Sequence, residues 1–188
     1  METEKRKAAG RKRTGAQILN DALKLHKLYD HCMENADDLI TEAKILRDHK
    51  RFARALFLAH TALEEIAKAQ VVADYAEDCV SREELDMAFR SHSMKSAYLE
   101  RKVELRLGSD RQTNATIRYD LKRGKHMAEW REQALYVSFV LDFDSFWPEH
   151  QITEKQCESM IREAEEYIQY LREMAAITGR LGIKSLTK

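Results

Sequence analysis

The chain has 188 residues, of which 44% are hydrophobic and 34% are charged, and its 32 basic and 32 acidic residues give a formal net charge of zero. One proline and six glycines among many Leu, Ala, Glu, Lys and Arg residues favour helices and argue against a β-sandwich or barrel. This balance also excludes a strong overall field that would steer the chain to nucleic acid, and no apolar run approaches the length of a membrane span.

The cysteines indicate the compartment. Cys32, Cys79 and Cys157 are odd in number and widely spaced, so they form neither a zinc-binding pattern nor a disulfide framework. Buried thiols in a reducing cytosol explain them better. The N-terminus lacks the apolar segment of a signal peptide. We therefore expect a soluble, cytoplasmic protein.

Residues 1–13 are rich in Lys and Arg and contain almost nothing apolar, which predicts a disordered basic arm. A weak role in tethering RNA or in localisation is the alternative. A first helix is expected from Thr14, whose spacing to Gln17 is that of a capping box, to about Arg47. A short polar turn at 48–50 then makes the next helix its antiparallel neighbour.

This second helix, expected to run to about 78, contains the most informative stretch of the chain, RFARALFLAHTALEEIAKAQ at 51–70. Its periodicity predicts a helix that is buried nearly all round, with charges set among apolar side chains. Glu64 and Glu65 precede Lys68 by four and three residues, so either carboxylate can reach the lysine. The charges form either a structural ion pair or part of a functional cluster, since buried charges are costly unless paired or used.

The pattern of the remaining sequence predicts three more helices. One begins at the capping box of Ser81 and continues to about Leu107, and a polar linker follows at 108–114. The next spans about 115–140, and Gly124 marks a break in its middle. The apolar segment at its end could pass for a strand, but a lone strand would be marginal, so we expect the helix to give way to an extended loop. The last begins at Thr153, and residues 179–188 form a flexible tail.

The sequence thus predicts an all-α, single-domain helical bundle of about five helices, with the folded domain at 14–178.

The chemistry-bearing residues fit several sites. There is no P-loop, dinucleotide fingerprint, HExxH or G-x-S-x-G motif. His60 with Glu64 leaves open a carboxylate–histidine metal site, although the spacing is not the Glu-x-x-His of di-iron bundles. If the second and third helices pack side by side, His92 and Lys95 can join the Glu–Lys face. A histidine there could act as acid–base in phosphodiester cleavage by a ribose 2′-hydroxyl, although a lone histidine is more often a surface or capping residue.

Three segments in order resemble the AbiV-type abortive infection proteins: ALFLAHTALEEIAK at 55–68, FRSHSMK at 89–95 and REQALYV at 131–137. The resemblance covers about 19–171. It implies a bacterial antiphage protein that arrests infected cells by acting on RNA or the translation machinery. It also implies kinship with the HEPN superfamily, whose members are compact helical bundles that usually dimerise and often act as metal-independent RNases.

By that resemblance the candidate catalytic residues, which need no metal or other cofactor, are Glu65, Lys68, His92, Lys95 and Arg131. His92 would be the acid–base group, and Lys68, Lys95 or Arg131 would stabilise the phosphate. Typical HEPN RNases carry an Arg four to six residues before a His on one helix. Here Arg123 precedes His126 by three residues and Arg90 precedes His92 by two, so neither pair has that spacing.

The expected partners are a second copy of the chain, RNA or the translation machinery, and a phage-encoded protein, with no membrane. Because the net charge is zero, RNA would bind a local basic patch, for which Arg101, Lys102 and Arg106 are the candidates. The alternative is a non-catalytic module that recognises a phage or host protein. In that case Glu64, Glu65 and Lys68 are structural.

Overall fold

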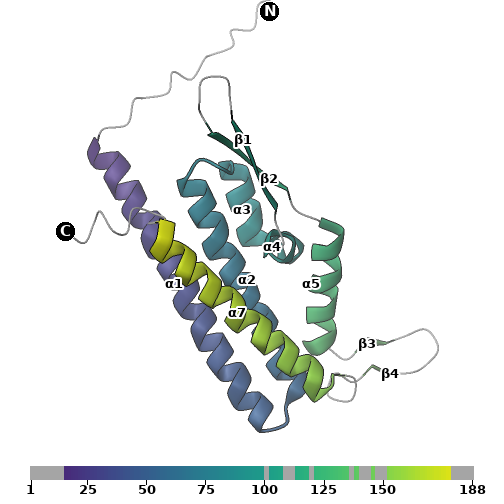
Figure 1. Cartoon of the computed structure of the whole chain (residues 1–188). Helices are drawn as coiled ribbons and strands as arrows, with labels where there is room; N and C mark the ends of the chain where they lie inside the picture. Colours follow the sequence, from purple (N-terminus) through teal and green to yellow (C-terminus); the bar gives the residue numbers. More distant parts are fainter. Residues whose placement is uncertain are drawn as a thin grey trace, which may run out of the picture.

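Helices dominate the computed structural model, which describes residues 15–99, 102–107, 113–118, 121–135, 138–139, 145–146 and 152–178. The helices of this described part are α1 (Gly15–Asp48), α2 (Phe52–Ala76), α3 (Arg82–Arg90), α4 (His92–Leu99), α5 (Leu121–Leu135) and α7 (Glu154–Thr178) (Figure 1). The strands are β1 (Lys102–Leu107), β2 (Thr113–Arg118), β3 (Ser138–Phe139) and β4 (Ser145–Phe146). The buried core comes almost entirely from the helices, so the predicted all-α bundle is confirmed.

Helices α1 and α2 form an antiparallel pair around a tight turn, as the sequence predicted. The Lys50 N–H donates to the Arg47 carbonyl at 2.8 Å and the Arg51 N–H donates to the Leu46 carbonyl at 2.9 Å. Lys50 itself is left-handed, with φ of 58°. This hydrogen-bond pattern is a Schellman cap, which ends one helix and reverses the chain.

Helix α2 lies at the centre of the molecule. Helices α1 and α7 pack on one side of it, and α4 and α5 pack on another (Figure 1). Its buried residues include the polar His60, Glu64, Gln70 and Asp74, so the predicted all-round burial is correct. Many of the others are alanines, whose small side chains let several helices approach the same axis. A buried charge on α2 must therefore be paired, either along α2 itself or with a neighbouring helix.

The prediction of one helix from 81 to 107 is wrong. The α3 helix ends at Arg90, and Ser91 has extended dihedral angles (φ −111°, ψ 120°). The Ser91 hydroxyl accepts from the Met94 N–H at 3.2 Å, so this residue also caps the start of α4. The turn aims α4 in a new direction and brings its first residue, His92, against α2.

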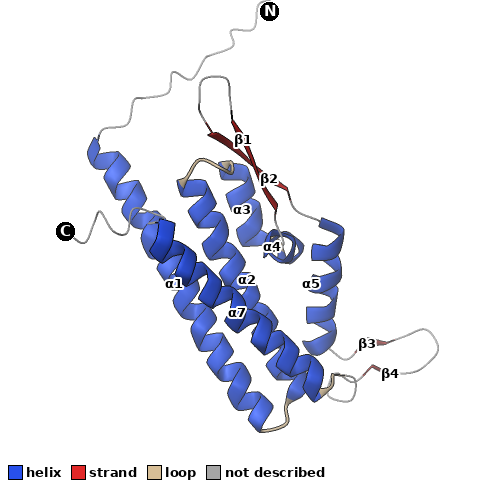
Figure 2. Ribbon diagram, viewed as in Figure 1, coloured by secondary structure: helices blue, strands red, loops and turns tan. Residues whose placement is uncertain are grey.

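Beyond α4 the chain forms a hairpin where the sequence predicted helix. Strands β1 and β2 pair antiparallel, with Lys102 opposite Arg118 and Leu107 opposite Thr113 (Figure 2). The alternation of apolar and polar residues in KVELRL and the β-branched residues of TNATIR explain this choice. The predicted polar linker at 108–114 thus overlaps the connection between two strands.

The predicted helix over 115–140 is wrong at both ends. The α5 helix begins only at Leu121 and ends at Leu135, after which the β3 and β4 strands pair in a short ladder. Gly124 lies inside α5 and does not break it. The apolar tail that the sequence assigned to helix and loop therefore contains a strand with a partner.

The predicted capping boxes of the third and last helices are present. Ser81 and Glu84 bond each other's backbone N–H groups at 3.2 and 2.8 Å, and Thr153 does the same with Gln156 at 3.3 and 2.8 Å. The predicted arm at 1–13 and tail at 179–188 lie outside the described residues. The boundaries at 14 and 178 therefore stay predictions.

Candidate functional site

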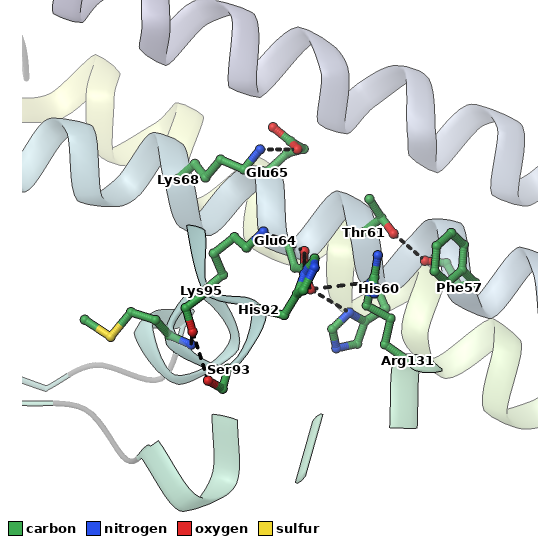
Figure 3. A network of polar contacts seen from close by, with 12 residues as sticks. Phe57, His60, Thr61, Glu64, Glu65, Lys68, His92, Ser93, Lys95 and Arg131 are labelled. Carbon is green, nitrogen blue, oxygen red and sulfur yellow. Dashed lines mark hydrogen bonds and ion pairs between the residues drawn. The ribbon is translucent and has the colours of Figure 1, made fainter. Parts of the chain in front are cut away.

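A buried carboxylate is the centre of the polar network on α2. Glu64 is 2% exposed, and its two oxygens accept from His92 Nδ1 at 2.9 and 2.8 Å (Figure 3). The ammonium of Lys95 lies 3.0 Å from Glu64 Oε2. His92 and Lys95 are three residues apart and therefore share one face of α4. The α4 helix thus contacts α2 through His92 and Lys95, which share the carboxylate of Glu64.

The third partner of Glu64 comes from α5. Arg131 Nε lies 3.6 Å from Glu64 Oε1, and the guanidinium stacks over the Phe57 ring with its central carbon 4.7 Å from the ring centre. Nε makes no hydrogen bond, so this is an ion pair without a direct hydrogen bond. Three predicted site residues, His92, Lys95 and Arg131, are therefore brought together.

His60 also faces Glu64 but does not form an ion pair with it. Its Nδ1 lies 3.8 Å from Glu64 Oε1, and the residue is 2% exposed. The pKa of His60 is lowered to about 4, chiefly by burial; the charge of Glu64 opposes this shift, and those of Arg131, His92 and Lys95 add to it. His60 is therefore neutral at physiological pH. Sequence reasoning considered it only as a metal ligand, although its spacing four residues before Glu64 placed it on the same face of α2.

His92 is the surface-facing member of this group. Its side chain is 45% exposed, whereas those of Lys95 and Arg131 are 7% and 16% exposed. Because a carboxylate only accepts hydrogen bonds, Nδ1 carries the proton and Nε2 is the nitrogen left for chemistry. A buried carboxylate that orients an exposed imidazole in this way is suited to general acid–base catalysis.

The site carries more positive than negative charge. Lys95 and Arg131 are two cations against the single carboxylate of Glu64, and His60 is neutral. An excess of positive charge beside an exposed imidazole favours an anionic group such as a phosphate.

Glu65 and Lys68, the other two candidates, pair with each other, whereas His92, Lys95 and Arg131 meet at Glu64. Lys68 Nζ lies 2.5 Å from Glu65 Oε1, and the ammonium lies 5.6 Å from the centre of the Phe89 ring of α3. Figure 3 shows this pair apart from the Glu64 group, which consists of His60, Glu64, His92, Lys95 and Arg131. Adjacent residues on a helix point about 100° apart, so Glu64 and Glu65 meet different neighbours.

The neighbour on that side is Cys32 of α1. The pKa of the Cys32 thiol is raised to about 11, chiefly by burial and also by Glu65, while Lys68 acts in the opposite direction. A thiol held protonated in this way is unreactive. Glu65 and Lys68 therefore lie beside a buried, protonated thiol.

The predicted RNA-binding patch cannot be compared with the geometry. Arg101 lies outside the described residues, and Lys102 and Arg106 lie on β1, where only the backbone is described. The patch stays a prediction.

Among the described residues, no group of three or more His, Cys, Asp or Glu side chains is placed to hold a metal ion. His60, Glu64 and His92 are side chains of ligand type that lie together, and they share their space with the cations of Lys95 and Arg131. A metal cation there would be repelled by both.

A family model described as AbiV, of the HEPN type, matches residues 24–169. The chain belongs to the AbiV family. Every described residue of the Glu64 group lies inside the matched range, and the family assigns the chain an abortive-infection, HEPN-type role. Comparisons with curated proteins and with solved structures gave no match. None of the helices described for this AbiV-family chain has the length and apolar content to cross a bilayer.

Proposed function

We propose that this AbiV-family chain arrests infected cells by cutting RNA, as a metal-independent endoribonuclease that uses His92 as its acid–base group. The observation that carries the proposal is the buried Glu64 carboxylate bound to Nδ1 of the exposed His92. The cations of Lys95 and Arg131 beside it supply the charge that a phosphodiester needs. Loss of cellular RNA, including the RNA of the translation machinery, would stop growth.

The reaction follows from the position of Nε2. His92 Nε2 takes the proton of a ribose 2′-hydroxyl, and the 2′-oxygen attacks the adjacent phosphorus. The bond from phosphorus to the 5′-oxygen breaks, the leaving oxygen takes up a proton from water, and the imidazolium of His92 gives its proton to the hydroxide that remains. The products are a 2′,3′-cyclic phosphate and a 5′-hydroxyl end. Glu65 and Lys68 pair with each other away from His92, so the proposal gives them a structural role.

The test is RNA cleavage in the presence of EDTA, with total cellular RNA and intact tRNA as substrates. Wild type should cut RNA, leave DNA intact and produce 2′,3′-cyclic phosphate ends. His92→Ala should cut at least roughly 100-fold more slowly, since a positioned acid–base group contributes about 10²–10⁴. The matched control is His31→Ala, which removes an exposed histidine of α1 and should cut like wild type. Cleavage by His92→Ala at the wild-type rate would place the chemistry elsewhere.

The second candidate function is a non-catalytic module that recognises a phage or host protein. The observation that favours it is that His92, Lys95 and Arg131 hold α4 and α5 against α2 through Glu64, which is a structural task in itself. Intact RNA in every assay, together with phage protection by a folded His92→Ala variant, would favour this module. The next measurement would then be a pull-down from phage-infected cells.

The effector works as a homodimer. The membership of the chain in a HEPN-type family supports this, because HEPN domains often dimerise. Sedimentation equilibrium of the purified chain tests this point. A single species of 22.0 kDa at micromolar concentration would contradict it.

A further inference from the structure

Helices α4 and α5 approach each other closely at Gly124. A Cβ added there would lie 2.1 Å from the Ser93 carbonyl oxygen, 2.7 Å from Ala97 Cβ and 2.8 Å from the Ala97 nitrogen. Two of these atoms are backbone, so the contact cannot be relieved by rotating a side chain. Only glycine lets the two helix axes lie this close together.

The same face of α5 carries Arg131. Gly124 and Arg131 are seven residues apart, which is two turns, so both point to the same side of the helix. Gly124 meets α4, and Arg131 reaches past it to Glu64 and Phe57 of α2. The distance between α4 and α5 at Gly124 thus sets how far Arg131 extends toward the carboxylate.

Helix α4 is held to α2 by several polar contacts. Its His92 and Lys95 pair with Glu64, and its buried Tyr98 donates to the buried Asp74 of α2 at 2.7 Å. A wedge between the helices would therefore displace α5 and withdraw Arg131, while His92 keeps its carboxylate.

We propose that Gly124 is a positioning residue, whose close contact with Ser93 and Ala97 places the Arg131 guanidinium against Glu64. The inference concerns the geometry of the site, and it rests on the proposed function only for its effect on RNA cleavage. Gly124 touches no substrate in this scheme. It acts through Arg131.

The experiment is a double-mutant cycle on thermal unfolding with Gly124→Ala and Arg131→Met. In the wild-type background Arg131→Met should lower the unfolding midpoint by several degrees, because roughly 2–4 °C corresponds to each kcal/mol lost in a domain of this size. In the Gly124→Ala background the same substitution should lower it by less than half as much, since Arg131 has already lost its partners. Equal shifts in both backgrounds would overturn the proposal.

The control is Ala128→Gly, which weakens α5 without adding an atom toward α4. Arg131→Met should cost the full amount in that background, whereas a reduced cost there would mean that any weakening of α5 acts like the wedge. If Gly124→Ala fails to fold, Ala97→Ser introduces a single extra atom at the same contact and repeats the cycle.

RNA cleavage separates this inference from the proposed function. If wild type cuts RNA, Gly124→Ala should cut as slowly as Arg131→Met, and the double variant should be no slower than either. An additive loss would contradict the proposal. If wild type cuts no RNA, the proposed nuclease fails, and the unfolding cycle still decides the role of Gly124.

Discussion

At the scale of single residues, Glu64 is the group on which the site depends. Its carboxylate is 2% exposed, and three side chains from two other helices converge on it. Lys95 is itself 5% exposed, so removing the negative charge would leave a buried ammonium without compensation. Glu64 therefore carries both the geometry of His92 and part of the stability of the fold.

We expect Glu64→Gln to lower the free energy of unfolding by about 3–5 kcal/mol, the usual cost of breaking a buried ion pair from one side. Urea denaturation followed by circular dichroism measures it. The matched control is Glu165→Gln, which removes the same charge from the exposed pair with Lys44 and should cost within about 1 kcal/mol. Equal losses in the two variants would show that the Glu64 network contributes nothing special to stability.

His60 should make stability depend on pH. Its pKa is about 4 in the fold against 6.5 when exposed, so between these values the unfolded chain binds a proton that the folded chain does not. The neutral, buried His60 leaves the free energy of unfolding at its full value above pH 6.5. This free energy then decreases as the pH falls toward 4. At about 1.4 kcal/mol per pH unit the loss reaches about 3 kcal/mol. Urea midpoints across this range measure it, and His60→Gln should flatten the curve. An unchanged slope in that variant would assign the effect to other groups.

Most residues of the site could be predicted from the sequence, but the contacts between them could not. Residue spacing already indicated His92 and Lys95, a resemblance in short motifs added Arg131, and the structure brings the three together. The sequence analysis named Glu65 as the catalytic candidate, whereas His92, Lys95 and Arg131 contact Glu64, because the outcome depends on which side of α2 receives α4. Helical periodicity gives the 100° between two neighbours and not the position of the next helix.

At the scale of elements, α4 is a short helix that is held to α2 near both of its ends. His92 and Lys95 bind Glu64 near its start, and Tyr98 donates to Asp74 near its end. Tyr98 and Asp74 are 0% and 1% exposed. An eight-residue helix has little stability of its own, so these contacts decide where it lies.

Tyr98→Phe should lower the free energy of unfolding by about 1–3 kcal/mol, because it removes the hydroxyl that donates to a buried carboxylate. Urea denaturation gives the value. Tyr170→Phe, on the exposed face of α7, is the matched control and should change stability by less than about 0.5 kcal/mol. A neutral Tyr98→Phe would mean that the hydrogen bond to Asp74 does not help to hold α4.

The elements that the sequence predicted correctly are those specified locally. The capping boxes at Ser81 and Thr153 and the polar turn at 48–50 each involve a few neighbouring residues, and all of them are present. The β1–β2 hairpin was missed because Leu99, Val103 and Leu107 also fit a helical spacing. The outcome depended on pairing with residues 113–118, and that pairing joins two segments across a loop.

At the scale of the whole molecule, α2 ties the bundle into one unit. It contacts α1, α3, α4, α5 and α7, so no pair of these helices encloses a separate core. Composition alone predicted this helical class, since a chain poor in Gly and Pro and rich in helix formers has few other choices.

Because of this arrangement, urea unfolding should be a single cooperative transition. Far-UV circular dichroism reports all helices, and Trp130 fluorescence in a Trp147→Phe variant reports α5. The two curves should coincide, since α5 packs on α4 and on α2. A fluorescence transition at lower urea would show that α4 and α5 detach before the rest of the bundle.

The central place of α2 also orders the steps of biosynthesis. The chain leaves the ribosome from its N-terminus, so α1 and α2 emerge while α4, α5 and α7 are still to be made. At that stage the Glu64 carboxylate has none of the partners that α4 and α5 supply. The nuclease site that we propose is complete only when Arg131 has emerged, so we expect a chain that ends before α5 to lack one of the two cations beside His92.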